Sequence, residues 1–338
     1  MIKKLCVLFL LICVAPALAA DPDWQPVLTD LLKSEKTGFG GLCGVVVDHQ
    51  SGDVWVNLSD RGTFHSRDQG QTWKRVSDTQ PKGRTETPGC WLLDPTGPSG
   101  KMVTALVYGS PISVSTDRAV TWKYLDNKSG HIDWCGVDWT DPDQKFVLAL
   151  KHEAGGLLLS STDGGQSFVE VGKGHGTGWI FDGQTAVVAE AKTKEKPKPN
   201  LLRTTDRGQT FRPCGEYSPV GTNSAQALPK WRAGSLYWLV DGGLITTTDK
   251  GETWKKIGEV QDAQYGPVFG KNAEQMFVLT KAGVSESTDG GATWSKPLSP
   301  PKEMKGIGGL SWLEYDPRHD VLYLMKMGSD LYRLTRAK

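Results

Sequence analysis

One octapeptide pattern, Ser/Thr-x-Asp-x-Gly-x-Thr/Ser-Trp/Phe, recurs along this chain of 338 residues and limits its possible folds more than any other feature. The third position of the six copies is Asp68, Asp117, Asp163, Asp206, Asp249 and Asp289. Successive aspartates are 49, 46, 43, 43 and 40 residues apart. A period of about 20 to 50 residues is typical of solenoids, propellers and other arrays, so we expect one repeated structural unit.

The octapeptide has the chemistry of a tight turn that leads into a strand. An Asp side chain accepts hydrogen bonds from backbone N–H groups just ahead of it, and a glycine two positions later supplies a left-handed conformation. The Thr and Trp that follow suit the pleated surface of a strand, where the aromatic ring can pack between neighbouring sheets. Only the second copy lacks the glycine, since Ala119 stands there, and we expect its turn to be looser.

The same pattern predicts which octapeptide positions matter for stability. Trp254→Ala should cost several kcal/mol, as other large core truncations do. Glu252 occupies a variable position of the same turn, so Glu252→Ala should cost less than about 0.5 kcal/mol.

Each repeat contains three further strand-like runs before its octapeptide. In the first repeat these are residues 42–48, 53–57 and 63–66, and the octapeptide opens a fourth run at 72–76. Four short strands in about 40 to 45 residues is the signature of a β-propeller blade. The sequence therefore predicts an all-β fold, a β-propeller whose length corresponds to about seven blades.

The seventh unit, residues 308–336, has three strand-like runs but no octapeptide and no fourth strand. Residues 24–27 share the Trp-x-x-Val form of residues 73–76. We expect this N-terminal segment to complete the seventh blade and close the ring, because closure removes exposed sheet edges. A helix is the alternative, since the apolar residues from Val27 to Leu32 are helically spaced, and a short helix over 29–36 could also follow the strand.

Residues 1–20 have the form of a secretory signal peptide. Lys3 and Lys4 precede an apolar run of about ten residues, too short to span a bilayer, and Ala17-Leu18-Ala19 fits the small-x-small cleavage rule. We therefore expect an exported protein, periplasmic or secreted, with residues 21–338 as a single propeller domain and no membrane span. Lys and Arg total 39 against 38 for Asp and Glu, which argues against a nucleic-acid partner. We expect a monomer without a cofactor.

Four cysteines follow the leader: Cys43, Cys90, Cys135 and Cys214. Their spacing does not suggest zinc. Export permits disulfides, so a bridge between Cys90 and either Cys43 or Cys135 is conceivable, and buried free thiols are the alternative. We expect Cys214 to stay unpaired.

The octapeptides resemble Asp-boxes, also called BNR repeats. The resemblance implies a propeller over nearly the whole mature chain, and it implies that the six aspartates are structural and lie on the face opposite the usual ligand site. Proteins with this repeat include sialidases, xyloglucanases, sortilin-type receptors and a photosystem II assembly-factor type. Seven blades, one domain and export resemble the assembly-factor or sortilin type most.

The segment Gly38–Cys43 lacks the Arg-Ile-Pro that marks the first arginine of a sialidase. Three arginines around the substrate carboxylate, and a Tyr–Glu nucleophile pair, would also be needed. The chain is therefore not expected to be a true sialidase.

Candidate ligand-binding residues gather in the loops around the third blade. If the Asp-boxes join third and fourth strands, the opposite face carries the loops between second and third strands and those between blades. On that face we place His131, Asp133, Trp134, Lys151, His152, Glu153, His175 and Trp179. The three histidines could converge on a metal, with Asp133 or Glu153 completing the set. His152 and Glu153 could instead be an acid/base pair, or all could be ordinary solvated loop residues.

Two other loops are less informative. Residues 190–200 form a Lys/Pro-rich insertion that could dock an acidic partner, although such a segment is usually solvated. Glu216 and Tyr217 are adjacent on a loop and are expected to point apart.

These observations favour a binding or assembly scaffold that recognises a protein or a glycan through its loop face. The alternative is a glycoside hydrolase acting on an extracytoplasmic glycan, which needs two carboxyl groups, such as Asp133 and Glu153, at a defined separation.

Overall fold

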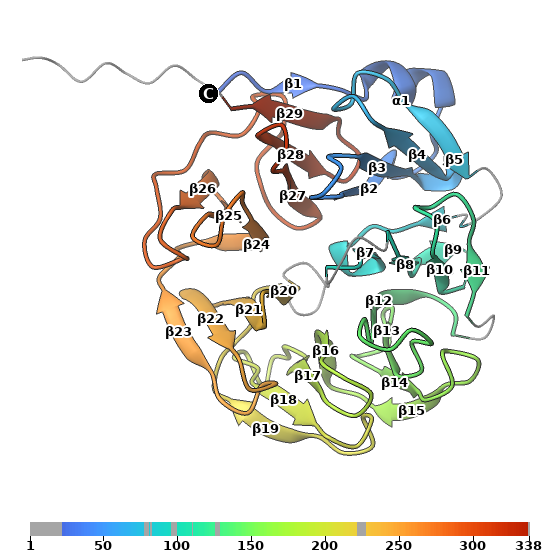
Figure 1. The fold of residues 1–338 in the computed structure, drawn as a ribbon, viewed down its shortest axis with the longest axis vertical. Coiled ribbons are helices and arrows are strands. Elements are labelled where there is room, and N and C mark those ends of the chain that lie inside the picture. Colours follow the sequence, from blue (N-terminus) through green and yellow to red (C-terminus); the bar gives the residue numbers. More distant parts are fainter. Residues whose placement is uncertain are drawn as a thin grey trace, which may run out of the picture.

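The computed structural model describes residues 22–77, 81, 83–95, 100–109, 111–125, 129–221 and 228–336. The proposed signal peptide, residues 1–20, lies outside the described residues. Seven antiparallel sheets follow one another in chain order around a ring, so the chain is a seven-bladed β-propeller (Figure 1). No helix in the described ranges is long and apolar enough to cross a membrane.

Each blade is a meander whose first strand lies nearest the ring centre (Figure 1). The first three blades are β2 (Leu42–Val47), β3 (Val54–Leu58), β4 (Thr63–Ser66) and β5 (Lys74–Ser77); β7 (Trp91–Leu93), β8 (Met102–Thr104), β10 (Ser113–Ser115) and β11 (Lys123–Tyr124); and β12 (Ile132–Val137), β13 (Val147–Lys151), β14 (Leu158–Ser161) and β15 (Val169–Gly172). Blade 2 also carries a two-stranded ribbon of β6 (Gly83–Arg84) and β9 (Tyr108–Gly109), and 3-10 turns lie at Ser59–Arg61 and Pro88–Cys90.

The remaining blades complete the ring. They are β16 (His175–Ile180), β17 (Ala186–Glu190), β18 (Leu201–Thr204) and β19 (Arg212–Gly215); β20 (Lys230–Arg232), β21 (Ser235–Val240), β22 (Gly243–Thr247) and β23 (Lys255–Gly258); β24 (Ala263–Phe269), β25 (Met276–Thr280) and β26 (Gly283–Ser287); and β27 (Ser311–Asp316), β28 (Val321–Lys326), β29 (Leu331–Thr335) and β1 (Gln25–Pro26). In blade 6 an isolated bridge between Val284 and Leu298 stands where a fourth strand would pair.

The inner strands of a blade are apolar along their length because neighbouring blades cover both of their faces. Every residue of β2 and of β3 is buried. An outer strand such as β23 begins instead with two exposed lysines. Continuous rather than alternating apolar runs are expected for strands buried on both sides.

The N-terminal segment closes the ring as predicted, and both structures that its sequence suggested are present. Gln25 and Pro26 pair with Arg333 and Tyr332 of β29. The helix α1 (Thr29–Glu35) follows directly. Asp330 accepts hydrogen bonds from the Leu28 N–H at 2.8 Å and the Thr29 hydroxyl at 2.6 Å, which ties the strand-to-helix junction to blade 7.

Each octapeptide forms a turn stabilised by its aspartate. At Asp249, Oδ1 accepts bonds from the Thr253 N–H at 2.9 Å and the Thr247 hydroxyl at 2.7 Å, and Oδ2 accepts the Thr253 hydroxyl at 2.6 Å. The Gly251 N–H donates to the Thr247 hydroxyl at 3.0 Å. The same set of bonds recurs at Asp68, Asp117, Asp163, Asp206 and Asp289.

Two expectations about these turns need correction. The Ala119 copy is not looser, because Ala119 adopts the left-handed conformation (φ +66°) and its N–H donates to Ser115 at 2.9 Å as glycine does elsewhere. The fourth strand also begins later than predicted, at Lys74 rather than Thr72. The Thr72 N–H is bonded to Asp68 and so is not available to the sheet.

Candidate functional site

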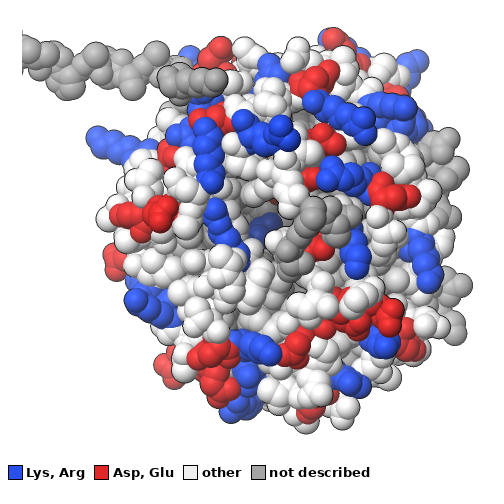
Figure 2. Space-filling model, viewed as in Figure 1, with Lys and Arg blue, Asp and Glu red and all other residues white. Residues whose placement is uncertain are grey.

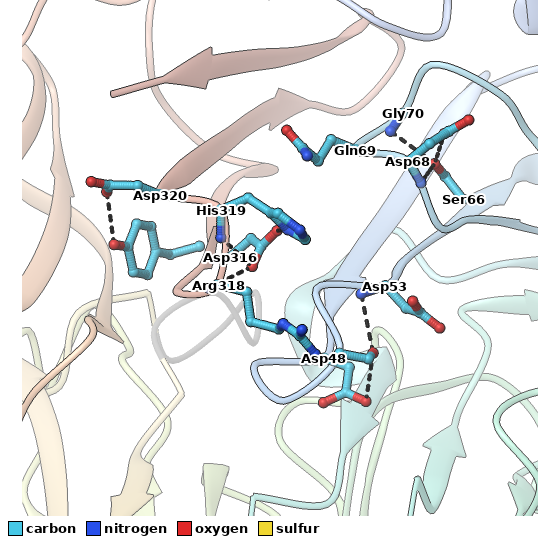
Figure 3. Close-up of polar contacts among 12 residues, drawn as sticks. Asp48, Asp53, Ser66, Asp68, Gln69, Gly70, Asp316, Arg318, His319 and Asp320 are labelled. Carbon is cyan, nitrogen blue, oxygen red and sulfur yellow. Dashed lines mark hydrogen bonds and ion pairs between the residues drawn. The ribbon is translucent and has the colours of Figure 1, made fainter. Parts of the chain in front are cut away.

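The meander places the functional loops at two opposite ends of the ring. Turns between first and second strands lie at the same end as the Asp-box turns, and we call this the Asp-box end. Figure 3 shows this end, where the first Asp-box turn, with Asp68 and Gly70, lies beside the turns that hold Asp48 and Asp316. The turns between second and third strands and the loops between blades lie at the other end, which we call the histidine end because His131, His152 and His175 are there.

A cavity of about 440 Å³ lies in the centre of the ring and reaches the first-to-second-strand turns of the Asp-box end. Figure 2 shows the hollow at the ring centre with basic side chains along its edge. Seven aromatic side chains contribute to the wall: Trp91, Trp139, Trp179, Trp231, Tyr265, Phe269 and Trp312. They come from blades 2 to 7, and Trp179 and Trp231 are parallel with ring centroids 6.1 Å apart.

Blade 1 contributes residues 45–50, including His49, to the cavity wall. The strand that leads to them approaches its neighbours closely at Gly44. A Cβ on Gly44 would lie 2.5 Å from the Thr85 hydroxyl, 3.2 Å from the Trp312 ring and 3.4 Å from the Trp91 ring. Two large indoles can therefore flank this strand only because residue 44 has no side chain.

The charged groups of the cavity are arranged around blade 5. Lys230 and Arg232 are two residues apart on β20, and both line the cavity. The Lys230 ammonium is 5.7 Å from the Tyr265 ring centroid, and the Arg232 guanidinium is 5.0 Å from that of Phe269. Neither cation forms an ion pair with a carboxylate of the described residues, and Arg232 Nη1 is buried without a hydrogen-bond partner.

Two titratable groups beside these cations have shifted pKa values. Burial, reinforced by Lys230, lowers the pKa of His49 to about 4, so its imidazole is neutral at physiological pH. Burial raises the pKa of Glu314 to about 7, although Lys230 opposes the shift. The Tyr265 hydroxyl donates to Glu314 at 3.4 Å, and burial raises the pKa of that phenol as well. The Glu314 carboxyl group is therefore partly protonated near neutral pH.

The residues predicted as a ligand site around the third blade do not lie together: some line a small cavity, one is in the core, and one faces the central cavity. Asp133, Lys151, Glu153 and His175 line one smaller cavity of about 240 Å³ at the histidine end. Trp134 is 1% exposed in the core between blades 3 and 4 and offers no surface to a ligand. Trp179 lies at the far end of β16 and faces the central cavity.

His152 links the two carboxylates predicted beside it. Its Nδ1 is 2.7 Å from Asp133 Oδ1, and its Nε2 is 3.7 Å from Glu153 Oε1. Burial raises the pKa of Asp133, and the bond to His152 opposes the shift. The imidazole thus fills the space between the two carboxyl groups.

His131 lies beside His152, since both rings contact Tyr108 (His152 at 5.4 Å), and His175 contacts other residues. His131 packs against the Tyr108 ring at 4.6 Å, and Arg84 lies on the same Tyr108 ring at 4.5 Å. His175 Nδ1 lies 3.2 Å from the Gly172 carbonyl oxygen, and its ring contacts Phe211. Among the described residues, no group of three or more His, Cys, Asp or Glu side chains is placed to hold a metal ion. The predicted convergence of the three histidines is therefore wrong.

The other candidates from the sequence are the cysteines, the 190–200 insertion and the Glu216–Tyr217 pair. All four described cysteines are free thiols, and Cys43, Cys90 and Cys135 are buried. In the 190–200 insertion, Lys196 pairs with Glu190 of the same loop. Tyr217 packs into the core of blades 4 and 5 while Glu216 is exposed.

Sequence reasoning missed His49, Lys230, Arg232, Tyr265 and Glu314. One available signal was the segment Lys230-Trp231-Arg232, which puts two cations around an aromatic at the start of an inner strand. This pattern does not predict which face of the strand lines the cavity at the ring centre.

The comparison with protein families supports the Asp-box repeat. The BNR/Asp-box repeat family matches residues 64–75, which contain the whole of the first octapeptide. A comparison with curated proteins gives no match.

Several solved structures share the fold at low sequence identity. YCF48 bound to a D1 peptide is 15% identical, over 95% of this chain and 99% of that chain, with a TM-score of 0.54. The extracellular domain of the putative one component system BT4673 from B. thetaiotaomicron is 8% identical, over 92% of this chain and 40% of that chain, with a TM-score of 0.53. The GH74 enzyme of Niastella koreensis is 13% identical, over 88% of this chain and 66% of that chain, with a TM-score of 0.42.

Proposed function

We propose that this chain, an Asp-box β-propeller of seven blades, is a binding protein that holds a segment of a protein or glycan in the cavity at its ring centre. The observation that carries the proposal is the wall of that cavity, where aromatic rings from six blades surround two cations that have no carboxylate partner among the described residues. A large concave site with apolar walls and a few polar groups is the usual form of a ligand site. Rigid blades would hold these side chains in place without ligand-induced ordering.

The carboxylates of the chain favour binding over glycoside hydrolysis. Hydrolysis needs two carboxyl groups that face each other across the glycosidic bond. Asp133 and Glu153 contact opposite nitrogens of His152, so a side chain occupies the place of the substrate. The Tyr265–Glu314 pair has a single arginine, Arg232, beside it in the cavity wall, where a sialidase would need three.

Three further observations support the proposal, two on location and one on the kind of ligand. Residues 1–20 have the pattern of an export signal, and the fold neighbour from B. thetaiotaomicron is an extracellular domain. We therefore place the binding activity outside the cytoplasm. The fold neighbour YCF48 is bound to a D1 peptide, so a propeller of this size can bind a protein segment.

A binding screen with matched variants tests the proposal. The mature chain is screened against a glycan array and a panel of exported proteins, and each ligand is measured again with Trp179→Ala/Trp231→Ala. The control is Val120→Ser/Val169→Ser, which changes two exposed apolar residues of the outer surface. We expect ligands whose binding is lost in the cavity variant and kept in the control, with both variants folded by thermal unfolding. Binding that survives loss of the two indoles, or turnover of an aryl glycoside, would contradict the proposal.

A further inference from the structure

The cavity at the ring centre has two cationic side chains in its wall, and they indicate the charge of its ligand. Lys230 and Arg232 lie on the same face of β20, since residues i and i+2 of a strand point to the same side. Arg232 is partly buried against Phe269 and has an unpartnered, buried Nη1. Both residues are partly buried, and neither has a carboxylate partner among the described residues. Because a partly buried charge gains from an opposite charge, the two cations favour an anionic ligand.

Asp48 and Glu314 of the wall do not form ion pairs with these two cations. Asp48 forms its ion pair with Arg118, at 3.0 Å, and not with Lys230 or Arg232. Lys271 at the rim already pairs with Asp320 at 2.7 Å. Glu314 is more than ion-pair distance from both cations of β20, and its hydrogen-bond donor is Tyr265. An anion from outside the chain would complete the site.

The hydrogen-bonding groups of the wall are mostly donors. Besides the two cations, Trp91 and Trp312 have buried Nε1 atoms without an acceptor. Unpartnered indoles also occur at Trp254 and Trp294, outside the cavity, so the two cations carry the argument. A wall of donors suits a carboxylate, which only accepts hydrogen bonds. A sugar is a poorer match, because each hydroxyl also needs an acceptor.

The rest of the wall indicates what the carboxylate is attached to. Trp179, Trp231, Phe269 and Val268 give the cavity an apolar surface, and its volume of about 440 Å³ exceeds what a single carboxylate fills. We infer that the ring centre binds a carboxylate carried by an apolar protein segment, held between Lys230 and Arg232 with its apolar side chains against the tryptophans. This inference rests on the proposed function and names the chemistry of the ligand.

Defined peptides test the inference and separate the two sources of a carboxylate. The probes are acetyl-Gly-Leu-Phe with a free C-terminus, the same peptide as its C-terminal amide, and acetyl-Gly-Asp-Phe amide. Calorimetry gives affinities, and the indole N–H resonances of Trp91 and Trp312 report whether the cavity is occupied. We expect at least one carboxylate peptide to bind ten-fold or more tightly than acetyl-Gly-Leu-Phe amide, as charge-assisted hydrogen bonds would give. Preference for the first or the third peptide identifies a chain end or a side chain as the source.

Variants locate the effect. Lys230→Met/Arg232→Met should bind the acid and its amide equally, whereas Lys255→Met/Arg67→Met, which removes two exposed cations, should keep the ten-fold preference. Lys230→Arg should retain it as well, since the charge is kept. Equal binding of acid and amide by the unchanged protein, binding of none of the carboxylate peptides, or tighter binding of a galacturonic acid trimer would each overturn the inference. If the screen nevertheless finds a ligand that depends on Trp179 and Trp231, the proposed function stands without it.

Discussion

At the residue scale, the left-handed glycine of each Asp-box is constrained by the blade before it as well as by its own turn. Gly251 has φ +77°, and a Cβ there would lie 2.4 Å from Val187 Cγ1 of blade 4. The equivalent Gly291 would meet Leu244 at 2.9 Å. Ala119 is tolerated because its methyl group finds space in a core with Trp55 and Trp91. The glycine thus lets neighbouring blades approach each other.

Substitution of two Asp-box glycines should separate backbone strain from this packing. Gly251→Ala should lower the free energy of unfolding by about 3 kcal/mol, since left-handed strain adds to displacement of a buried valine. Gly290→Ala has a similar φ of +73° but no atom within 4 Å of its Cβ, and should cost about 1 kcal/mol or less. Equal losses for the two in urea unfolding would show that packing between blades is unimportant.

Glu252 is more important than its variable position in the octapeptide suggests. It pairs with Arg203 at 2.8 Å and with Arg212 at 2.9 Å, and the Arg203 side chain is only 10% exposed. Glu252→Ala should therefore cost about 1 kcal/mol, because a largely buried guanidinium loses its partner. This corrects the smaller cost expected from the sequence.

The control for Glu252 is the same position of another Asp-box. Gln209 is exposed there, and Gln209→Ala should change the free energy of unfolding by less than about 0.5 kcal/mol. A loss for Glu252→Ala as small as that for Gln209→Ala would contradict the role given to Arg203.

At the element scale, ring closure depends on a very short strand that side chains reinforce. β1 contributes two residue pairs to β29. The Trp24 Nε1–H donates to the Ser299 carbonyl at 2.8 Å, and the Trp73 Nε1–H donates to the Val27 carbonyl at 2.9 Å. These contacts join the N-terminal segment to blades 6, 7 and 1.

Asp330 is the residue through which this closure can be tested. Asp330→Ala removes the acceptors of the buried Leu28 N–H and the Thr29 hydroxyl, and should cost about 1–3 kcal/mol. Hydrogen exchange should quicken first in β29, which pairs with β1. Asp330→Asn, which keeps one carbonyl acceptor, should cost less.

The control is Asp143→Ala, since that side chain is 70% exposed and pairs only with Lys145; it should change stability by less than about 0.5 kcal/mol. Unchanged exchange in β29 of the Asp330→Ala protein would mean that closure does not depend on this aspartate.

At the scale of the whole molecule, closure of the ring brings charged residues from distant parts of the chain together at its centre, and Glu314 is one of them. Burial raises the pKa of Glu314 to about 7, from about 4.3 in an unfolded chain. Between these values the folded protein holds a proton that the unfolded chain has released, so this group makes stability fall as pH rises. Below the lower value, and above the higher one, its contribution does not change with pH.

Glu314→Gln should remove this pH dependence. The variant should match the unchanged protein near pH 4.5 and exceed its free energy of unfolding by up to about 4 kcal/mol at pH 8, the limit set by the pKa difference. Denaturant titrations at several pH values measure this, with the exposed Glu170→Gln as control. Parallel pH profiles for Glu314→Gln and the unchanged protein would show that Glu314 is not buried as described.

The fold was predictable because its determinants are local and repeated. The donors and acceptors that stabilise the turn lie within the octapeptide itself. At Asp249, for example, the carboxylate accepts bonds from the Thr253 N–H and hydroxyl. The period then sets the number of blades, and the Trp-x-x-Val likeness identified the closing segment, which the structure confirms.

The site was less predictable because it depends on which strand face meets the channel. The pairing of β12 with β13 shifts between Ile132 and Trp134, and such an irregularity redirects the side chains that follow it. Trp134 is consequently in the core although the chain around it was expected at a ligand face. The repeated turn and the blades follow from the order of residues, since their contacts lie close together along the chain. The shared cavity of His49, Lys230, Tyr265 and Glu314 does not, because residues from four different blades meet only when the ring is closed.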